Sequence, residues 1–170
     1  MQQSVSKITR VSTMCLQWLL IAAMTLLVVD VVWGVLTRYV GGEQASWTEE
    51  LARFLLIWVS LLGGAAAFEQ KSHLGVDYFV TKFDDSIRDN LKRFSYAIVL
   101  FFAISIFVVG GSRVVYNALV LDQTTPALGW KMGFVYLAIP ISGVFMVLFT
   151  IANLLELRND ESNDKSTEAS

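Results

Sequence analysis

The chain has little of the chemistry that most enzymes and metal sites use. Its 170 residues include one cysteine, Cys15, and one histidine, His73. A single cysteine excludes an intramolecular disulfide and a cysteine-based metal cluster. A single histidine excludes a haem held by two histidines of this chain and a zinc site built from His and Cys. Phosphate loops, nucleophile elbows and paired carboxylates are also missing, so we expect no enzyme activity, no cofactor in this chain and no nucleic-acid partner.

Charged residues are also scarce, at 16%, whereas hydrophobic residues make up 55% and the mean hydropathy is +0.56. An average soluble domain is less apolar and more charged. The apolar residues form long runs without alternation, which are typical of helices that cross a bilayer. The sequence therefore predicts an all-α integral membrane protein with transmembrane helices near 14–38, 48–68, 90–119 and 132–156. The first run is too long for a cleaved signal peptide, so we expect it to remain.

Lysine and arginine are distributed unevenly between these helices. Nine of the thirteen lie before the first helix, between the second and third, or after the fourth. The other four are Arg38, Arg53, Arg113 and Lys131. Because cytoplasmic loops carry an excess of Lys and Arg, both termini are predicted to be cytoplasmic. We expect one four-helix membrane domain, residues 1–156, followed by a disordered acidic tail, residues 157–170.

The second helix has a well-marked start. Ser46 and Glu49 have the spacing of a capping box, and Glu49 and Glu50 lie in the first turn, where acidic side chains favour the helix dipole. Glu49 also precedes Arg53 by four residues, which suits an ion pair within the helix. Two interpretations remain open, a capped helix end with solvated charges and a site that faces a partner.

Asp30 is the only carboxylate well inside an apolar run. Ionisable groups inside a membrane are costly and indicate function by default. Counting about 1.5 Å per residue puts Asp30 and Arg53 at a similar depth, roughly 6–8 Å outward of the midplane. A structural Asp30–Arg53 ion pair is therefore plausible. Proton or ion carriage by Asp30 and contact with another subunit are the alternatives.

Small residues recur in the last three helices, where they permit close helix approach. Either packing within the domain or an interface to a second membrane protein would explain them. They are Ser60, Gly63, Gly64 and Ala67 in the second helix, Ala103, Ser105, Gly110 and Gly111 in the third, and Ala138, Ser142 and Gly143 in the fourth.

The connections between helices carry two further patterns. From Val76 to Arg88 apolar residues recur every three or four positions, which predicts an amphipathic segment at the cytoplasmic surface before the third helix. His73 stands four residues before Asp77, and a local hydrogen bond or cap explains it better than a ligand. The loop 122–130 combines turn-forming residues with Trp130, as expected of an ordered loop at the membrane interface.

In order and spacing, these segments resemble the small membrane subunit of tripartite ATP-independent periplasmic (TRAP) transporters, the DctQ-like family, over residues 14–156. The matching pieces are Arg38-Tyr39, Trp47 to Arg53 with Trp58 and Gly63-Gly64-Ala65, His73 to Asp77, Thr124 to Leu128, and Tyr136 to Pro140. Two places depart from the pattern. Asp84-Asp85 and Lys131 stand where proline is common in this family, which puts the shape of those loops in question.

The resemblance implies a role. In this family a soluble periplasmic protein captures a carboxylate substrate, and a large elevator-type subunit moves it across the bacterial inner membrane with the sodium gradient. The small subunit binds the large one and helps brace its stationary scaffold. Sodium and substrate sites would then belong to the large subunit. Sialic acid is weakly favoured as the substrate, and C4-dicarboxylates and other organic acids remain open.

The resemblance also implies positions that meet partners. The outer loops near 40–48 and 120–131 are those expected to meet the periplasmic protein. The interaction positions that the resemblance implies are Trp47, Glu50, Arg53, His73, Asp77, Thr125 and Pro126. Further interface candidates are Arg38, Glu49 and Trp130.

Other functions make different demands on the sequence. A small four-helix proton-coupled exporter would use Asp30 as its proton carrier and would need this side chain unpaired and facing a cavity. The strong Lys/Arg bias and the long cytoplasmic loop argue against it. A redox-enzyme anchor would need histidine pairs for haem, and a structural four-helix protein would need no dedicated partner.

Overall fold

A computed structural model describes residues 2–43, 45–71 and 85–167, which are almost entirely helical. The first span is α1, Gln2–Gly41, and the second is α2, Ser46–Lys71. The third is one continuous helical rod made of α4, Asp85–Phe102, the π-helical η1, Ala103–Gly110, and α5, Gly111–Val120. The fourth combines α6, Met132–Tyr136, with α7, Ala138–Thr167.

Four helical segments are long and apolar enough to cross a membrane. They are Thr9–Gly41, Ser46–Glu69, Arg93–Val120 and Met132–Leu155. These segments confirm the four predicted transmembrane helices, and the described residues contain no β-strand. Most of the amphipathic segment expected before the third helix lies outside the described residues, as do His73 and Asp77.

The fourth helix differs from the prediction at its C-terminal end. α7 continues to Thr167, through most of the segment expected to be disordered. Extending an existing helix costs far less than nucleating one, so a helix can run past the apolar residues that anchor it. The boundary predicted near residue 156 therefore marks the end of the apolar run rather than the end of the helix.

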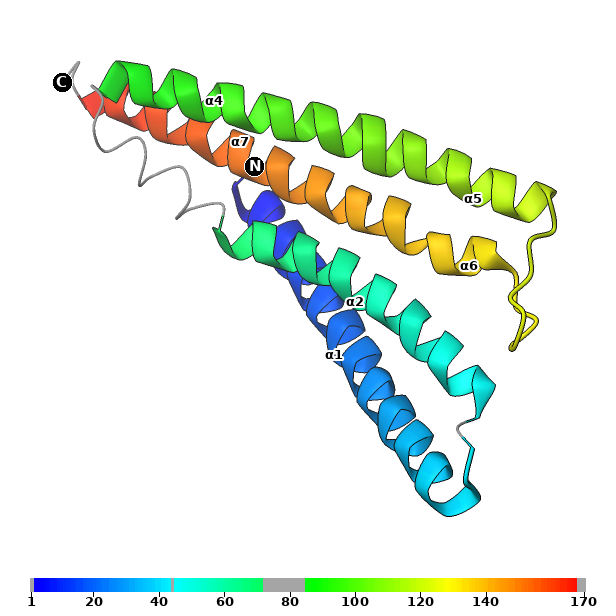
Figure 1. Cartoon of the computed structure of the whole chain (residues 1–170). Coiled ribbons are helices and arrows are strands. Elements are labelled where there is room, and N and C mark those ends of the chain that lie inside the picture. Colours follow the sequence, from blue (N-terminus) through cyan, green and yellow to red (C-terminus); the bar gives the residue numbers. More distant parts are fainter. Residues whose placement is uncertain (1, 44, 72–84, 168–170) are drawn as a thin grey trace.

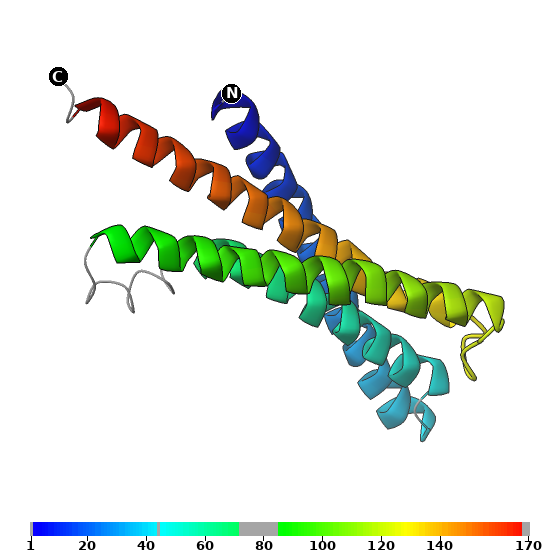
Figure 2. The same ribbon diagram turned by 90° about the horizontal axis from the view of Figure 1, so that it is seen from above.

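The spans form an open layer rather than a closed bundle (Figure 1). α1 packs against α2, α2 packs against α7, and α7 packs against η1 and α4. Figure 2 shows α1 crossing the direction of the other spans at a marked angle. α1 also reaches α7, where Leu16, Leu62, Ala65 and Phe149 form the buried core. Because each helix has few neighbours, much apolar surface stays exposed.

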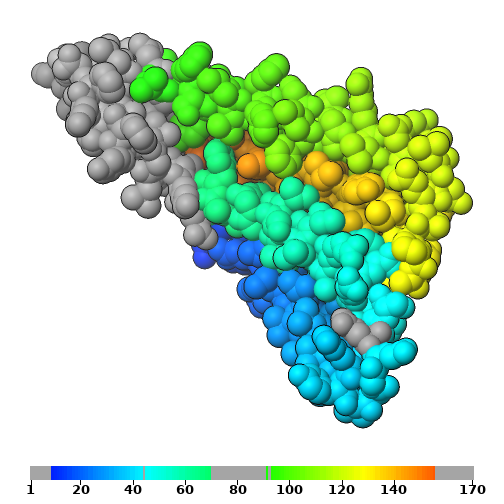
Figure 3. All heavy atoms as spheres, viewed as in Figure 1, coloured from blue at the N-terminus to red at the C-terminus, as the bar shows by residue number. Residues whose placement is uncertain are grey.

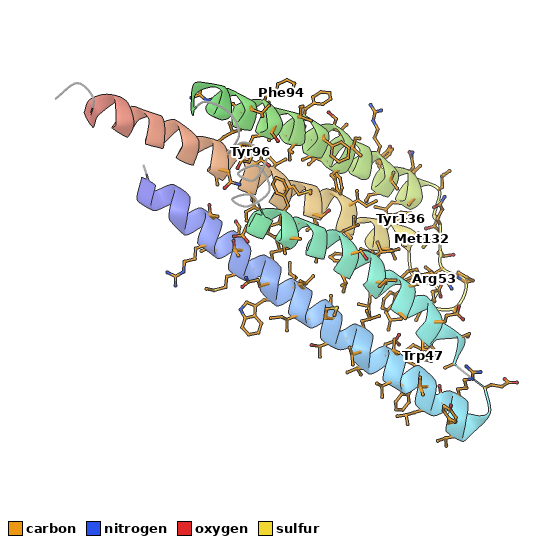
Figure 4. All side chains as sticks on the ribbon, turned by 60° about the vertical axis from the view of Figure 1, so that its left-hand side comes forward. Trp47, Arg53, Phe94, Tyr96, Met132 and Tyr136 are labelled. Atoms are coloured by element: carbon orange, nitrogen blue, oxygen red, sulfur yellow. The ribbon has the colours of Figure 1, made fainter. Side chains whose placement is uncertain are left out.

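α1 is held by one narrow seam. Its seam residues are Leu16, Leu20, Ala23, Leu27, Asp30, Gly34 and Thr37, and every other residue from Gln17 to Val40 is exposed. Their spacing alternates between four and three, the repeat of a coiled-coil seam. Figure 4 shows the remaining side chains of α1 projecting away from the other helices. Asp30 is thus placed inside a helix contact by the periodicity of α1.

The third and fourth spans approach closely because of two glycines. A Cβ at Gly143 would lie 2.5 Å from the Cβ of Phe107, and one at Gly111 would lie 2.8 Å from Cγ2 of Ile139. Neither position has room for a side chain. The small residues at these two positions therefore serve packing within the chain, one of the two explanations that the sequence left open.

Candidate partner-binding surface

The candidate residues that the structure describes lie at one end of the molecule, near the connection from α1 to α2 and the loop from α5 to α6 (Figure 1). This end, predicted to face outward, is called the outer end here. Figure 3 shows the α5–α6 loop resting against the start of α2. Charged side chains in the first turn of α2 can therefore either contact this loop or stay exposed to a partner.

α2 begins at Ser46, as predicted, but the capping box does not form as expected. The Thr48 hydroxyl and amide both donate to the carbonyl of Ala45, at 2.7 and 3.1 Å. Glu49 turns its carboxylate to Arg53, with 3.0 Å between Oε1 and Nη2, and not back toward Ser46. The predicted i,i+4 pair is therefore confirmed. Its two side chains remain 71% and 67% exposed.

Glu50 points the other way, into the molecule. It is only 9% exposed, and its Oε2 accepts the backbone N–H groups of Ala127 and Leu128 at 2.9 and 2.8 Å. Hydrogen bonds to a charged acceptor are the stronger kind. Glu50 was proposed as an interface residue, but in this structure its two hydrogen bonds hold the outer loop against α2.

Thr125 organises the outer loop from within. Its amide donates to the Trp130 carbonyl at 2.8 Å, and its hydroxyl accepts the Trp130 amide at 3.0 Å. Gly129 closes the turn with φ of +66°, a conformation that favours glycine, and donates to the Thr125 carbonyl. The loop is therefore ordered, as predicted, and the buried Thr125 is a structural residue.

Lys131 explains one departure from the family pattern. Its φ of −70° is one that proline also adopts, so the backbone here suits either residue. The lysine adds an ion pair, since its Nζ lies 3.1 Å from Oδ1 of Asp122. The sequence signal for this pair was the opposite charge at the two ends of the loop, and it was missed.

Besides the exposed Glu49–Arg53 pair, four of the described candidate residues are exposed at the outer end. They are Arg38, Trp47, Pro126 and Trp130. Together with Glu49 and Arg53 they are the candidates still free to meet a partner. The described interface candidates thus fall into two groups, the exposed residues and the buried Glu50 and Thr125, which stabilise the outer loop.

The proposed Asp30–Arg53 ion pair is absent from this structure. Asp30 is 5% exposed, and neither carboxylate oxygen has a hydrogen-bond partner within the described part of the chain. Arg53 bonds to Glu49 instead.

Depth is not what separates the two side chains. Thr13 Oγ1 donates to Glu69 at 3.3 Å, and Leu20 lies 3.7 Å from a Cβ built on Gly63. Stepping along α1 from these contacts while stepping back along α2 puts Asp30 level with Ala52 and Arg53. Asp30 faces the α1–α2 seam, but Arg53 is exposed. The predicted ion pair was wrong because the Arg53 side chain lies on the exposed side of α2 and does not face α1.

Comparison with known proteins gives a consistent result. Residues 24–159 match the family described as tripartite ATP-independent periplasmic transporters, DctQ component. The chain is 29% identical over 160 residues to the sialic acid TRAP transporter small permease protein SiaQ of Vibrio cholerae, covering 92% of this chain and 87% of that protein. It is 29% identical over 140 residues to a putative TRAP transporter small permease protein of Haemophilus influenzae, covering 82% and 85%.

A further relative has a different organisation. The isethionate TRAP transporter permease protein DctMQ of Oleidesulfovibrio alaskensis is 29% identical over 144 residues, which cover 79% of this chain but 22% of that protein. The segment that resembles this chain is therefore a minor part of one longer permease polypeptide.

Proposed function

Since the chain belongs to the DctQ component family of TRAP transporters, and so is a multi-pass transporter subunit rather than an enzyme, we propose that it binds and braces a large permease subunit. That subunit would be a sodium-coupled elevator in the bacterial inner membrane, and both termini of the small subunit would be cytoplasmic. The coupling sodium and the substrate would bind to the large subunit.

The relative with a single permease polypeptide is the observation that carries this proposal. In that protein the segment resembling this chain is covalently joined to the rest of the permease. Two relatives named small permease proteins are covered to 87% and 85% of their length by this match, and a small subunit of that kind needs a non-covalent interface to stay with the rest of the permease. The open layer of helices supports this, because only 11% to 33% of the residues in the most apolar part of the four spans are buried within the chain.

The exporter alternative fits the structure less well. A proton carrier must exchange protons with water on each side of the membrane through an accessible cavity. Asp30 is enclosed in the α1–α2 seam, at 5% exposure. The lack of a hydrogen-bond partner for Asp30 among the described residues agrees with a carrier, but the enclosure of Asp30 between two helices does not.

The outer end supports contact with a periplasmic substrate-binding protein. The loop is ordered by Glu50 and Thr125, and Pro126 and Trp130 stay exposed on it. Trp47 and Arg38 lie exposed near the other outer connection. A preformed loop loses little conformational freedom on binding, which favours recognition.

The substrate we propose is a carboxylate, with sialic acid as the first to test. One relative is named for sialic acid, which is a carboxylate, and another for isethionate, which is a sulfonate, each at 29% identity. Identity therefore does not select between substrates.

Affinity purification tests the proposed partnership. The full chain, tagged at one terminus, is co-expressed with the large subunit of the same transporter and extracted in mild detergent. We expect the two to co-elute as one complex in gel filtration. Recovery of the chain without the large subunit, under conditions where both are expressed in the membrane, would contradict the proposal.

A further inference from the structure

One strip of α2 stays exposed along the whole span, although α1 and α7 pack on this helix. Its members are Glu49, Arg53, Leu56, Ser60, Gly64 and Ala67, and these are all of the exposed residues between Thr48 and Glu69. They recur every three or four positions, so they share one side of the helix. α1 and α7 meet each other near Leu16 and Phe149, which leaves this side of α2 uncovered.

The strip differs in composition from the other exposed faces. Exposed positions on α1, on the third span and on α7 carry large apolar side chains, such as Trp18, Val28, Phe94, Phe101, Leu148 and Ile151. Such side chains suit contact with lipid chains. In the strip only Leu56 is of this kind. A Cβ built on Gly64 would meet nothing within 4 Å, so this part of the surface is open.

The outer part of the strip is charged. Glu49 and Arg53 lie within the span Ser46–Glu69, and Arg53 is seven residues beyond its start. Charged side chains inside spans rarely face lipid and usually meet protein or water. Within the described residues Arg53 makes one hydrogen bond, to Glu49, whereas a guanidinium carries five donors. The remaining donors fit a carboxylate or carbonyl of a partner.

We propose that this strip is where a transmembrane helix of the large permease subunit docks on the chain. Ser60, Gly64 and Ala67 let the partner's backbone approach closely, as small residues do between membrane helices. Arg53 binds an acceptor on that helix at the level of the Glu49–Arg53 pair. The inference rests on the proposed function, and the DctMQ relative, in which the corresponding segment is part of a longer permease polypeptide, supports the large subunit as the occupant.

Enlarging Gly64 tests the proposal without disturbing the chain itself. Gly64→Leu adds bulk where the structure has open space, and leucine favours helix more than glycine does. Ala97→Leu is the matched control, because Ala97 is exposed on α4 within the third span. Both variants are co-expressed with the large subunit, and circular dichroism and gel filtration check that each chain is folded.

We expect Gly64→Leu to lower the recovered large subunit by at least about tenfold, while Ala97→Leu leaves it at the wild-type level. Arg53→Gln should lower it too, with the chain itself still folded. Normal recovery with Gly64→Leu, or equal losses in Gly64→Leu and Ala97→Leu, would overturn the docking surface. If the wild-type chain recovers the large subunit in that experiment, the proposed function stands. Failure of the wild-type chain would remove both.

Discussion

Glu50 and Asp30 are both buried carboxylates on neighbouring helices, yet their surroundings are opposite. Glu50 accepts two backbone amides of the outer loop within 2.9 Å, and Asp30 has no hydrogen-bond partner in the described part of the chain. The loop offers free N–H groups because its backbone leaves the helix. The α1–α2 seam offers none, since helical amides are already bonded within each helix. Burial alone therefore does not say whether a carboxylate stabilises its site.

Removing the Glu50 carboxylate should change the stability of the chain more than any other substitution at these two sites. Glu50→Ala leaves the amides of Ala127 and Leu128 without their acceptor and frees the loop from α2. We expect the free energy of unfolding of the purified chain to fall by about 3 kcal/mol. Denaturation in mixed detergent micelles, followed by circular dichroism, measures this change. Glu49→Ala is the control and should change stability much less, because its carboxylate is exposed. Equal losses of stability in the two variants would show that the hydrogen bonds of Glu50 to the loop do not stabilise the chain.

Thr125 tests the same region inside the loop. Thr125→Val keeps the shape of the side chain but removes the acceptor for the Trp130 amide. The free energy of unfolding should fall by about 1 kcal/mol, the net value of one neutral hydrogen bond. The same denaturation experiment checks it. A change indistinguishable from zero would mean that water replaces the hydroxyl at no cost.

Asp30 should respond with the opposite sign. Asp30→Asn replaces a buried carboxyl that has no hydrogen-bond partner among the described residues by a neutral group of the same size. The free energy of unfolding should stay the same or rise by up to about 1 kcal/mol, because no hydrogen bond is lost and the desolvation cost falls. A clear loss of stability in the denaturation experiment would reveal a partner for Asp30 and end the contrast with Glu50.

Combining substitutions gives the smallest expected effect. Asp30→Asn together with Arg53→Gln should change stability by the sum of the single changes, within about 0.5 kcal/mol. The reason is that Arg53 bonds to Glu49 and makes no hydrogen bond with Asp30. A double-mutant cycle measures the difference. Coupling well above that margin would restore the ion pair that the sequence suggested.

The sequence predicted the features that depend on neighbours along one helix. The four spans, the start of α2 at Ser46 and the Glu49–Arg53 pair all follow from apolar runs or i,i+4 spacing, and all are confirmed. The contact of Glu50 with the outer loop joins residues 77 positions apart, and no local pattern marks it. Likewise, counting residues gave the depth of Asp30 and Arg53 but not the side of the helix on which Arg53 lies.

The roles of the glycines in the spans also depend on contacts between helices that are distant in the sequence. Gly143 and Gly64 are both small residues in helices, and the sequence could not tell packing within the chain from an interface. In the structure Gly143 is closed off by Phe107, whereas Gly64 is open. Only the arrangement of neighbouring helices separates the two roles.

Reconstituted transport tests the central claim, that this chain serves a larger permease and does not transport alone. Proteoliposomes would contain the chain alone, the large subunit alone, or both, with a substrate-binding protein and radiolabelled sialic acid outside and an inward sodium gradient. If sialic acid is inactive, other carboxylates are tested with their own binding proteins. We expect uptake only when both subunits are present. Uptake by the chain alone, or full uptake by the large subunit without it, would contradict this claim.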